Sequence, residues 1–146
     1  YSGRARVAES VGLELGAEFL SLDELLATAD FVSLHCPATP ETRNLIDARA
    51  LTLMRKDAVL INTARGDVVV EDDLVEALKN AEIAGAGLDV YAHEPSVPAE
   101  LQALEQVVLL PHMGSGTRET REAMGLCAMA NLQAYFAKQP LPNAIA

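Results

Sequence analysis

Three side chains that could bind and protonate a small anionic ketone lie in or beside apolar segments of the sequence. Arg65 and His112 each follow an apolar run, and Glu94 lies between them. A guanidinium holds a carboxylate and an adjacent ketone oxygen through its planar set of donors. An imidazolium donates the proton that a developing alkoxide needs, and a carboxylate beside its far nitrogen favours the charged ring. These residue types therefore fit the reduction of a 2-oxo acid.

Each residue also has an ordinary explanation. An Arg after a strand is usually a surface charge, a His between Pro and Met-Gly is usually a loop residue, and a Glu before Pro is usually solvated. Asp89 ends a segment rich in Ala and Gly, so it either hydrogen-bonds the carboxamide of a nicotinamide or caps a turn. Their occurrence together at successive strand ends favours the chemical interpretation.

The order of apolar segments predicts the elements that position these residues. Continuous apolar runs are typical of parallel strands, and helical periods alternate with them, which together indicate βαβ units. Ligands of such sheets bind beyond the carboxyl ends of the strands. The predicted strands are 31–35, 58–62, 83–90 and 107–110, and the predicted helices are 21–29, 47–54, 71–80 and 117–138.

Two local patterns add detail to these helices. Ser21-Leu22-Asp23-Glu24 is a capping box, which predicts where the first of them begins. The long last helix carries an apolar stripe that we expect to be core, formed by Met124, Cys127, Ala128 and Leu132.

Composition excludes several classes of partner. The net charge of −10 argues against binding to nucleic acid or to an anionic membrane, and no apolar run approaches the roughly 20 residues that span a bilayer. Cys36 and Cys127 lie far apart without metal-site spacing. We therefore expect reduced thiols, no metal and a cytoplasmic location.

Four segments carry a resemblance to a known family. They are Leu60–Val69, Gly85–Val90, His93–Pro95 and Leu110–Ser115. In order and spacing they resemble the D-2-hydroxyacid dehydrogenases, and the resemblance extends over nearly the whole chain. It implies an α/β fold with a Rossmann-like, doubly wound parallel sheet that is incomplete at its N-terminal side.

The resemblance also implies roles for individual residues. His112 would be the acid/base, Glu94 its carboxylate partner and Arg65 the clamp for the substrate. The cofactor would contact Pro37 near the adenosine ribose, Asp89 and the backbone of Thr63 near the nicotinamide, and Gly114 near the catalytic His.

The opening residues bear on the choice of cofactor. NAD-using relatives hold the ribose hydroxyls with an acid at the end of the second strand, but this neighbourhood has Ser2, Gly3, Arg4 and Arg6 and no acid. Arg4 suits the 2′-phosphate of NADPH, as in the glyoxylate/hydroxypyruvate reductases, although both arginines would also be explained by a solvent-facing position. We expect NADPH, with NAD possible.

The glycine-rich phosphate turn and the substrate lobe of the family are absent from these 146 residues. We therefore expect residues 1–146 to be the C-terminal part of an NAD(P)-binding domain, inactive alone, with helix 117–138 packing partly on the substrate lobe. The full-length protein would be a homodimeric reductase of glyoxylate, hydroxypyruvate or a related 2-oxo acid. Alternatives are an NAD-dependent D-3-phosphoglycerate or D-lactate-type dehydrogenase, and a dinucleotide-sensing corepressor.

Overall fold

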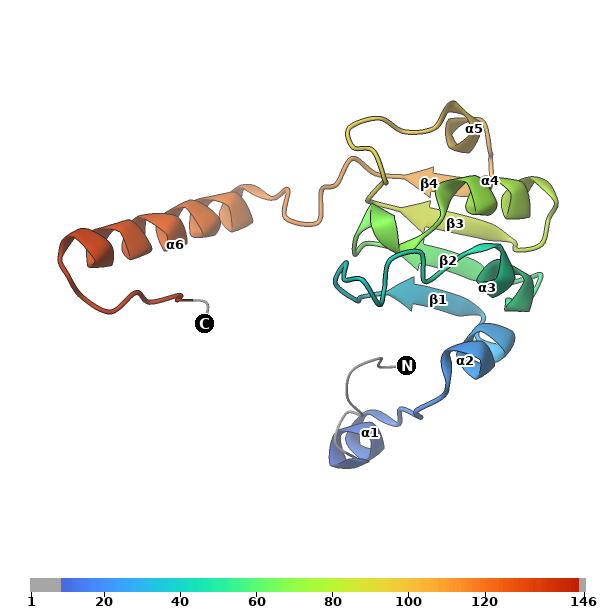
Figure 1. Ribbon diagram of the computed structural model, residues 1–146, viewed down its shortest axis with the longest axis horizontal. Helices are drawn as coiled ribbons and strands as arrows, with labels where there is room; N and C mark the ends of the chain where they lie inside the picture. Colours follow the sequence, from blue (N-terminus) through green and yellow to red (C-terminus); the bar gives the residue numbers. More distant parts are fainter. Residues whose placement is uncertain (1–8, 145–146) are drawn as a thin grey trace. The chain divides into compact units, whose positions relative to one another are not determined.

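A computed structural model describes residues 9–144 of the chain (Figure 1). The chain divides into two compact units, Tyr1–Pro111 and His112–Ala146.

The first unit alternates strands with helices. Its strands are β1 (Phe31–Leu34), β2 (Val59–Asn62), β3 (Gly85–Leu88) and β4 (Val107–Leu109). Its helices are α1 (Glu9–Leu15), α2 (Leu22–Thr28), α3 (Ala48–Leu53), the 3-10 turn η1 (Gly66–Val68), α4 (Glu71–Lys79) and α5 (Ala99–Gln102). The sequence predicts all four strands and helices α2, α3 and α4 at nearly these positions, but it does not predict α1 or α5.

The four strands form one parallel sheet in the order β1-β2-β3-β4 (Figure 1). Because each strand pairs with the next one along the chain, every connection crosses over the sheet in the manner of a βαβ unit. This confirms the predicted α/β class and the Rossmann-like parallel sheet. The order contains no reversal, so the described sheet has no topological switch point of its own.

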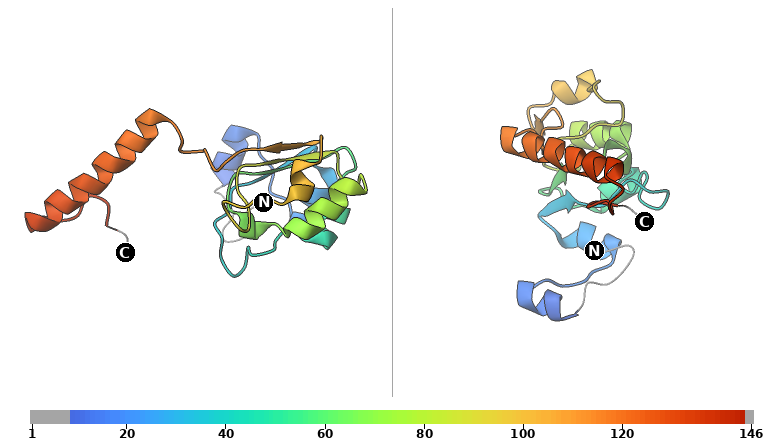
Figure 2. Two further views of the ribbon diagram at one scale, coloured as in Figure 1. Left: turned by 90° about the horizontal axis from the view of Figure 1, so that it is seen from above. Right: turned by 90° about the vertical axis from the view of Figure 1, so that its left-hand side faces the viewer.

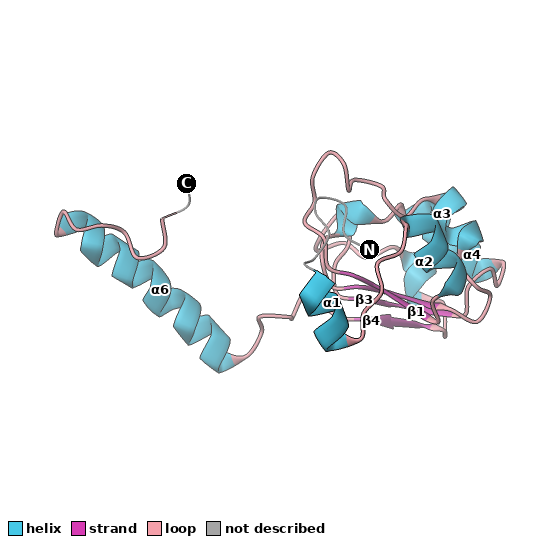
Figure 3. Cartoon of the chain, turned by 90° about the horizontal axis from the view of Figure 1, so that it is seen from below, coloured by secondary structure: helices cyan, strands magenta, loops and turns pink. Residues whose placement is uncertain are grey.

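Helices α2, α3 and α4 lie on one face of the sheet (Figures 2 and 3). In β1, Val32 and Leu34 are buried toward this face, whereas Phe31 alternates to the other face and is 69% exposed. Val108 of β4 is likewise 63% exposed. The helix layer that we expected on the second face is therefore not supplied by α2, α3 or α4.

The core lies between this helix layer and the sheet. Burial of its apolar side chains is the main stabilising term, at about 25 cal/mol for each Å² removed from water. The largest fully buried apolar side chains are Leu26, Ile46, Leu51, Leu60, Leu74, Leu78, Ile83 and Leu101.

Local hydrogen bonds explain where the core helices begin. The predicted capping box at α2 is confirmed, because the Glu24 amide donates to Ser21 Oγ and the Ser21 amide donates to Glu24 Oε2. The Ser21 hydroxyl, which donates to Glu24 Oε2 at 2.6 Å, and then the Ser21 amide lower the pKa of the Glu24 carboxyl. Helix α3 is capped by Asp47, whose side chain accepts from the Ala50 amide at 2.9 Å.

The second unit is built on helix α6 (Arg118–Phe136), which Thr117 caps at its N-terminus. The segment after the helix is tied back to it, since the side chain of Asn131 bonds Asn143 through both its amide nitrogen and its oxygen. No residue of α6 is buried, and Met124 and Leu132 are 59% and 58% exposed. The prediction that this apolar stripe is core is therefore wrong for the second unit taken by itself.

Within residues 9–144 no helix is long and apolar enough to cross a membrane. Cys36 is half-buried and Cys127 is exposed, and the structure joins neither of them in a disulfide.

Candidate active site

The carboxyl ends of the four strands lie in register. Leu34 pairs with Asn62, Asn62 with Leu88, and Leu88 with Leu109, so one row of residues crosses the whole sheet. Each segment that follows a strand therefore leaves the sheet from the same edge. This is the edge at which ligands of parallel sheets bind.

Several predicted site residues follow this row within the first unit. Thr63 and Arg65 come after β2, and Asp89 comes directly after β3, where its amide donates to the Asn62 carbonyl at 3.0 Å. Pro37 lies in the loop after β1, and its carbonyl accepts from the Thr42 hydroxyl. The fold thus brings these segments to one edge, whereas their contacts with substrate or cofactor stay a prediction.

The turn that carries Arg65 is organised by Asn62. Only 1% of Asn62 is exposed, and its side-chain amide donates to the Arg65 carbonyl at 3.0 Å while its oxygen accepts from the Ala64 amide at 3.1 Å. Both polar ends of this buried side chain are thus satisfied by the turn itself. Arg65 is left exposed, with a guanidinium nitrogen 2.7 Å from the Ala64 carbonyl that it donates to.

We expect Asn62→Ala to lower the free energy of unfolding by about 1–3 kcal/mol, because it removes the two hydrogen bonds by which the buried Asn62 side chain holds the turn. Urea unfolding followed by circular dichroism measures this change. Asn80→Ala, at an exposed position that ends α4, is the matched control and should change stability by less than about 0.5 kcal/mol. Equal effects of the two variants would mean that the Asn62 bonds contribute no net stability.

Glu94 and Asp89 occupy the segment after β3. Asp89 is buried, with 5% exposed. Glu94 is exposed, and its Oε1 accepts a hydrogen bond from the Tyr91 amide at 3.0 Å, which closes the turn between them. Tyr91 is buried, and this burial raises the pKa of its hydroxyl, which stays protonated and able to donate.

His112 is the first residue of the second unit and directly follows Pro111. Its φ of +52° lies in the left-handed region, where few residues other than glycine are found. Sparsely populated backbone conformations of this kind gather at functional sites. Gly114 is exposed in the same segment, and the Gly116 amide closes a turn there by donating to the Met113 carbonyl. The geometry of His112 toward Arg65 and Glu94 stays a prediction.

Other predicted residues fall outside the described part. Ser2, Gly3 and Arg4 precede residue 9, so the predicted contact with the cofactor 2′-phosphate is not described. In the described part of the chain, no three His, Cys, Asp or Glu side chains are grouped in a way that could hold a metal ion.

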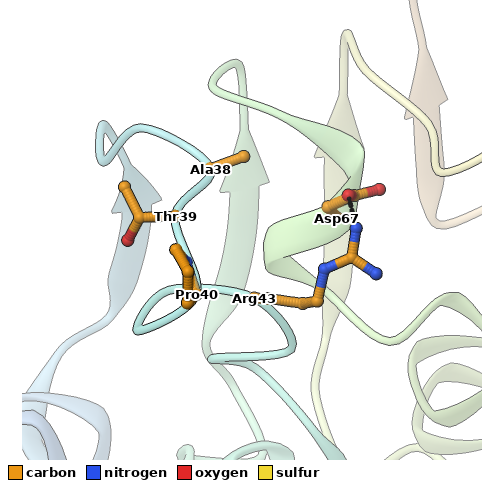
Figure 4. A pocket seen from close by; sticks show the side chains of 5 residues that line it. All are labelled: Ala38, Thr39, Pro40, Arg43 and Asp67. Atoms are coloured by element: carbon orange, nitrogen blue, oxygen red, sulfur yellow. Dashed lines mark hydrogen bonds and ion pairs between the residues drawn. The ribbon is translucent and has the colours of Figure 1, made fainter.

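A pocket lies between the loop after β1 and η1 (Figure 4). Its charged wall is an ion pair in which Arg43 Nη2 is 2.5 Å from Asp67 Oδ2. The loop after β1 is further tied to η1 because the Asn44 amide donates to the Asp67 carbonyl at 2.8 Å. Since both charged side chains are partly exposed, the ion pair contributes at most about 1 kcal/mol. The pocket is lined by Ala38, Thr39, Pro40, Arg43 and Asp67.

Comparison with known proteins identifies the family. Residues 1–114 match the model of the D-isomer specific 2-hydroxyacid dehydrogenase, NAD binding domain. The chain belongs to this family. It carries the Rossmann-like NAD-binding domain of these dehydrogenases, which confirms the resemblance found in the sequence.

Individual relatives are longer than this chain. It is 48% identical to the glyoxylate reductase of Thermococcus litoralis over 145 residues, which are 99% of this chain and 44% of that protein. An NADPH-dependent glyoxylate/hydroxypyruvate reductase from Sinorhizobium meliloti, crystallised with NADP and malonate, matches with a TM-score of 0.82 and 38% identity over 86% of this chain and 40% of its own. A D-lactate dehydrogenase with NAD+ from Lactobacillus jensenii matches with a TM-score of 0.87 and 31% identity over 98% of this chain and 46% of its own.

Two residues that hold the loops at this edge of the sheet were not identified from the sequence. Asn62 holds the Arg65 turn, and Glu71 at the start of α4 accepts a hydrogen bond from the Ala92 amide at 2.9 Å. A polar residue at the buried end of an apolar strand was a usable signal for Asn62. Glu71 stands among other acids in the first turn of its helix, so the sequence has no feature that distinguishes it.

Proposed function

We propose that this chain is the catalytic half of a reductase that gives a small 2-oxo acid, glyoxylate or hydroxypyruvate, a hydride and a proton to form a D-2-hydroxy acid. The observation that carries the proposal is the row of strand ends in register, from which Thr63, Arg65 and Asp89 follow at one edge of a family-typical sheet. The identity of 48% to a glyoxylate reductase over nearly the whole chain supports the substrate class.

The chemical groups at this edge fit a nicotinamide cofactor. Asp89 offers a carboxylate acceptor for a carboxamide N–H, and the peptide at Thr63, one strand away, offers a second polar group. Pro37 follows the neighbouring strand and would lie by the adenosine, with Gly114 near the catalytic His. A bound nicotinamide cofactor supplies the hydride for the ketone carbon.

The side chains of the chain supply the remaining chemistry. The Arg65 guanidinium holds the substrate carboxylate and ketone oxygen, which orients the ketone carbon. The His112 imidazolium donates a proton to the ketone oxygen as negative charge develops on it, so that the product is an alcohol. Glu94 accepts a hydrogen bond from the other ring nitrogen and keeps the imidazole oriented.

The direct test is a spectrophotometric assay of the complete natural protein with NADPH or NADH and a panel of 2-oxo acids. We expect glyoxylate and hydroxypyruvate to be reduced with the highest kcat/KM. Preference for 3-phosphohydroxypyruvate or pyruvate with NADH would instead support a D-3-phosphoglycerate or D-lactate-type dehydrogenase. No turnover of any 2-oxo acid, combined with tight binding of a dinucleotide, would support a sensing function.

We further propose that the chain is the C-terminal part of its cofactor domain. Within residues 9–144 the strand order lacks the reversal of a complete dinucleotide-binding sheet. The chain also spans less than half the length of the relatives described above. Helix α6, in which no residue is buried, supports the proposal that residues 117–138 pack on a substrate lobe. Sedimentation analysis of the complete protein tests the proposed homodimer.

Cofactor preference is expected to depend on Arg4. A charge-assisted hydrogen bond from Arg4 to the 2′-phosphate would contribute about 1.5–3 kcal/mol to the binding free energy of NADPH and nothing to that of NADH. This difference corresponds to a preference for NADPH of about 10- to 100-fold. Ser2 and the Gly3 backbone would add weaker contacts. We therefore expect Arg4→Ala to reduce the ratio of kcat/KM for NADPH over NADH by that factor.

Arg121→Ala, which removes one exposed positive charge from α6, is the control for a general electrostatic effect and should leave the ratio unchanged. A wild-type ratio near one, or a ratio that Arg4→Ala does not alter, would show that Arg4 is only a surface charge.

A further inference from the structure

The turn from Tyr91 to Glu94 is held from several sides by parts of the first unit. Its own end is closed by the bond from the Tyr91 amide to Glu94 Oε1. The Tyr91 hydroxyl donates to the carbonyls of Leu110 at 2.9 Å and Leu88 at 3.2 Å. The turn is therefore fixed to the ends of both β3 and β4, although it is largely surface-exposed at Glu94.

A second contact joins the same turn to the Arg65 loop. Gly66 lies so close to the peptide between Tyr91 and Ala92 that an added Cβ would be 2.0 Å from the Tyr91 carbonyl carbon and 2.4 Å from the Ala92 nitrogen. Only glycine permits this approach of the two backbones. The loop that follows Arg65 and the turn that carries Glu94 therefore pack directly against each other.

Glu71 completes this junction from helix α4. Its Oε1 accepts the Ala92 amide at 2.9 Å, although the two residues are 21 positions apart. Glu71 is the first residue of α4, which has no side-chain cap at Val70. Its carboxylate is thus used to hold the amide of a separate turn rather than to cap its own helix.

We propose that Glu71 is a positioning residue that sets the place of the Glu94 carboxylate by fixing the Ala92 amide. This rests on the proposed function, in which Glu94 orients His112. The bond holds the middle of the Tyr91–Glu94 turn against α4, while Gly66 supports the same peptide from the Arg65 loop. Without the bond, the turn keeps its contacts at Tyr91 but loses the hydrogen bond that holds Ala92, the residue that precedes His93 and Glu94.

The test compares single and double variants of the complete protein. We expect Glu71→Ala to lower kcat by about 10- to 100-fold, because displacement of a catalytic group by about 1 Å has effects of that size. The KM for cofactor should stay unchanged. In a Glu94→Ala background, Glu71→Ala should lower kcat by less than about twofold, because both changes then act on the same group.

Three further variants separate positioning from general stability. Glu71→Gln keeps an acceptor oxygen and should retain most of kcat. Glu71→Asp withdraws the acceptor by one methylene and should lower kcat as Glu71→Ala does. This variant therefore replaces Glu71→Ala in the test if Glu71→Ala does not fold. Asp72→Ala, at an exposed neighbour on α4, should leave kcat unchanged. Amide hydrogen exchange should be faster at Ala92 in Glu71→Ala and not in Asp72→Ala.

Equal losses of kcat from Glu71→Ala in the wild-type and Glu94→Ala backgrounds would overturn the positioning proposal and leave the proposed function intact. An Ala92 amide that exchanges at the wild-type rate in Glu71→Ala would also overturn it. If instead Glu94→Ala alone keeps wild-type kcat, the role of Glu94 in the proposed function is wrong, and the role of Glu71 falls with it.

Discussion

His112→Ala should lower kcat for 2-oxo acid reduction by about 10²- to 10⁴-fold in the complete protein, while the dissociation constant of the cofactor changes little. General acid catalysis by a positioned side chain contributes a factor of this size. The proton is transferred only as charge develops on the ketone oxygen, so the loss appears in the transition state and not in ground-state binding. Steady-state kinetics and cofactor titration by fluorescence measure the two quantities.

His35→Ala is the matched control for this prediction. His35 follows β1, is exposed and bonds the Ser33 hydroxyl through Nε2 at 2.8 Å, and we assign it no chemistry. It should leave kcat within about twofold of wild type, as expected for surface substitutions of small energetic effect. A loss from His112→Ala no larger than the loss from His35→Ala would remove His112 from the mechanism.

The sheet was predictable because its strands are encoded locally. The runs around Leu60 and Val107 are apolar without alternation, and the segments between them have helical periods, so a parallel α/β sheet follows from general rules. The common edge of Thr63, Arg65 and Asp89 follows in turn, because parallel strands all end at the same side.

Contacts between distant segments were not predictable in this way. The bond between Glu71 and the Ala92 amide, and the close approach of Gly66 to Tyr91, depend on how two loops meet after the sheet has formed. The packing of the apolar stripe of α6 was not predictable from the sequence either. A period of apolar residues such as Met124 and Leu132 shows that one face of a helix is apolar, but it does not show which surface covers that face.

Arg65→Ala should lower kcat/KM for the 2-oxo acid by about 10²- to 10⁴-fold. Two charge-assisted hydrogen bonds, one to the carboxylate and one to the ketone oxygen, contribute about 1.5–3 kcal/mol each, and their sum corresponds to this range. The bond to the carboxylate is present both in the bound substrate and in the transition state, so its loss raises KM. The bond to the ketone oxygen strengthens as charge develops and therefore lowers kcat when it is lost.

Arg65→Lys and Arg43→Ala make this prediction specific. Lysine keeps the charge of Arg65 but lacks the planar pair of donors, so we expect kcat/KM between those of wild type and Arg65→Ala. Arg43 is an exposed arginine of the same unit that already pairs with Asp67, and its removal should change kcat/KM by less than about twofold. Equal effects of Arg65→Ala and Arg43→Ala would show that Arg65 acts only through the general field of the protein. Recovery of full activity in Arg65→Lys would show that its charge matters and its planar geometry does not.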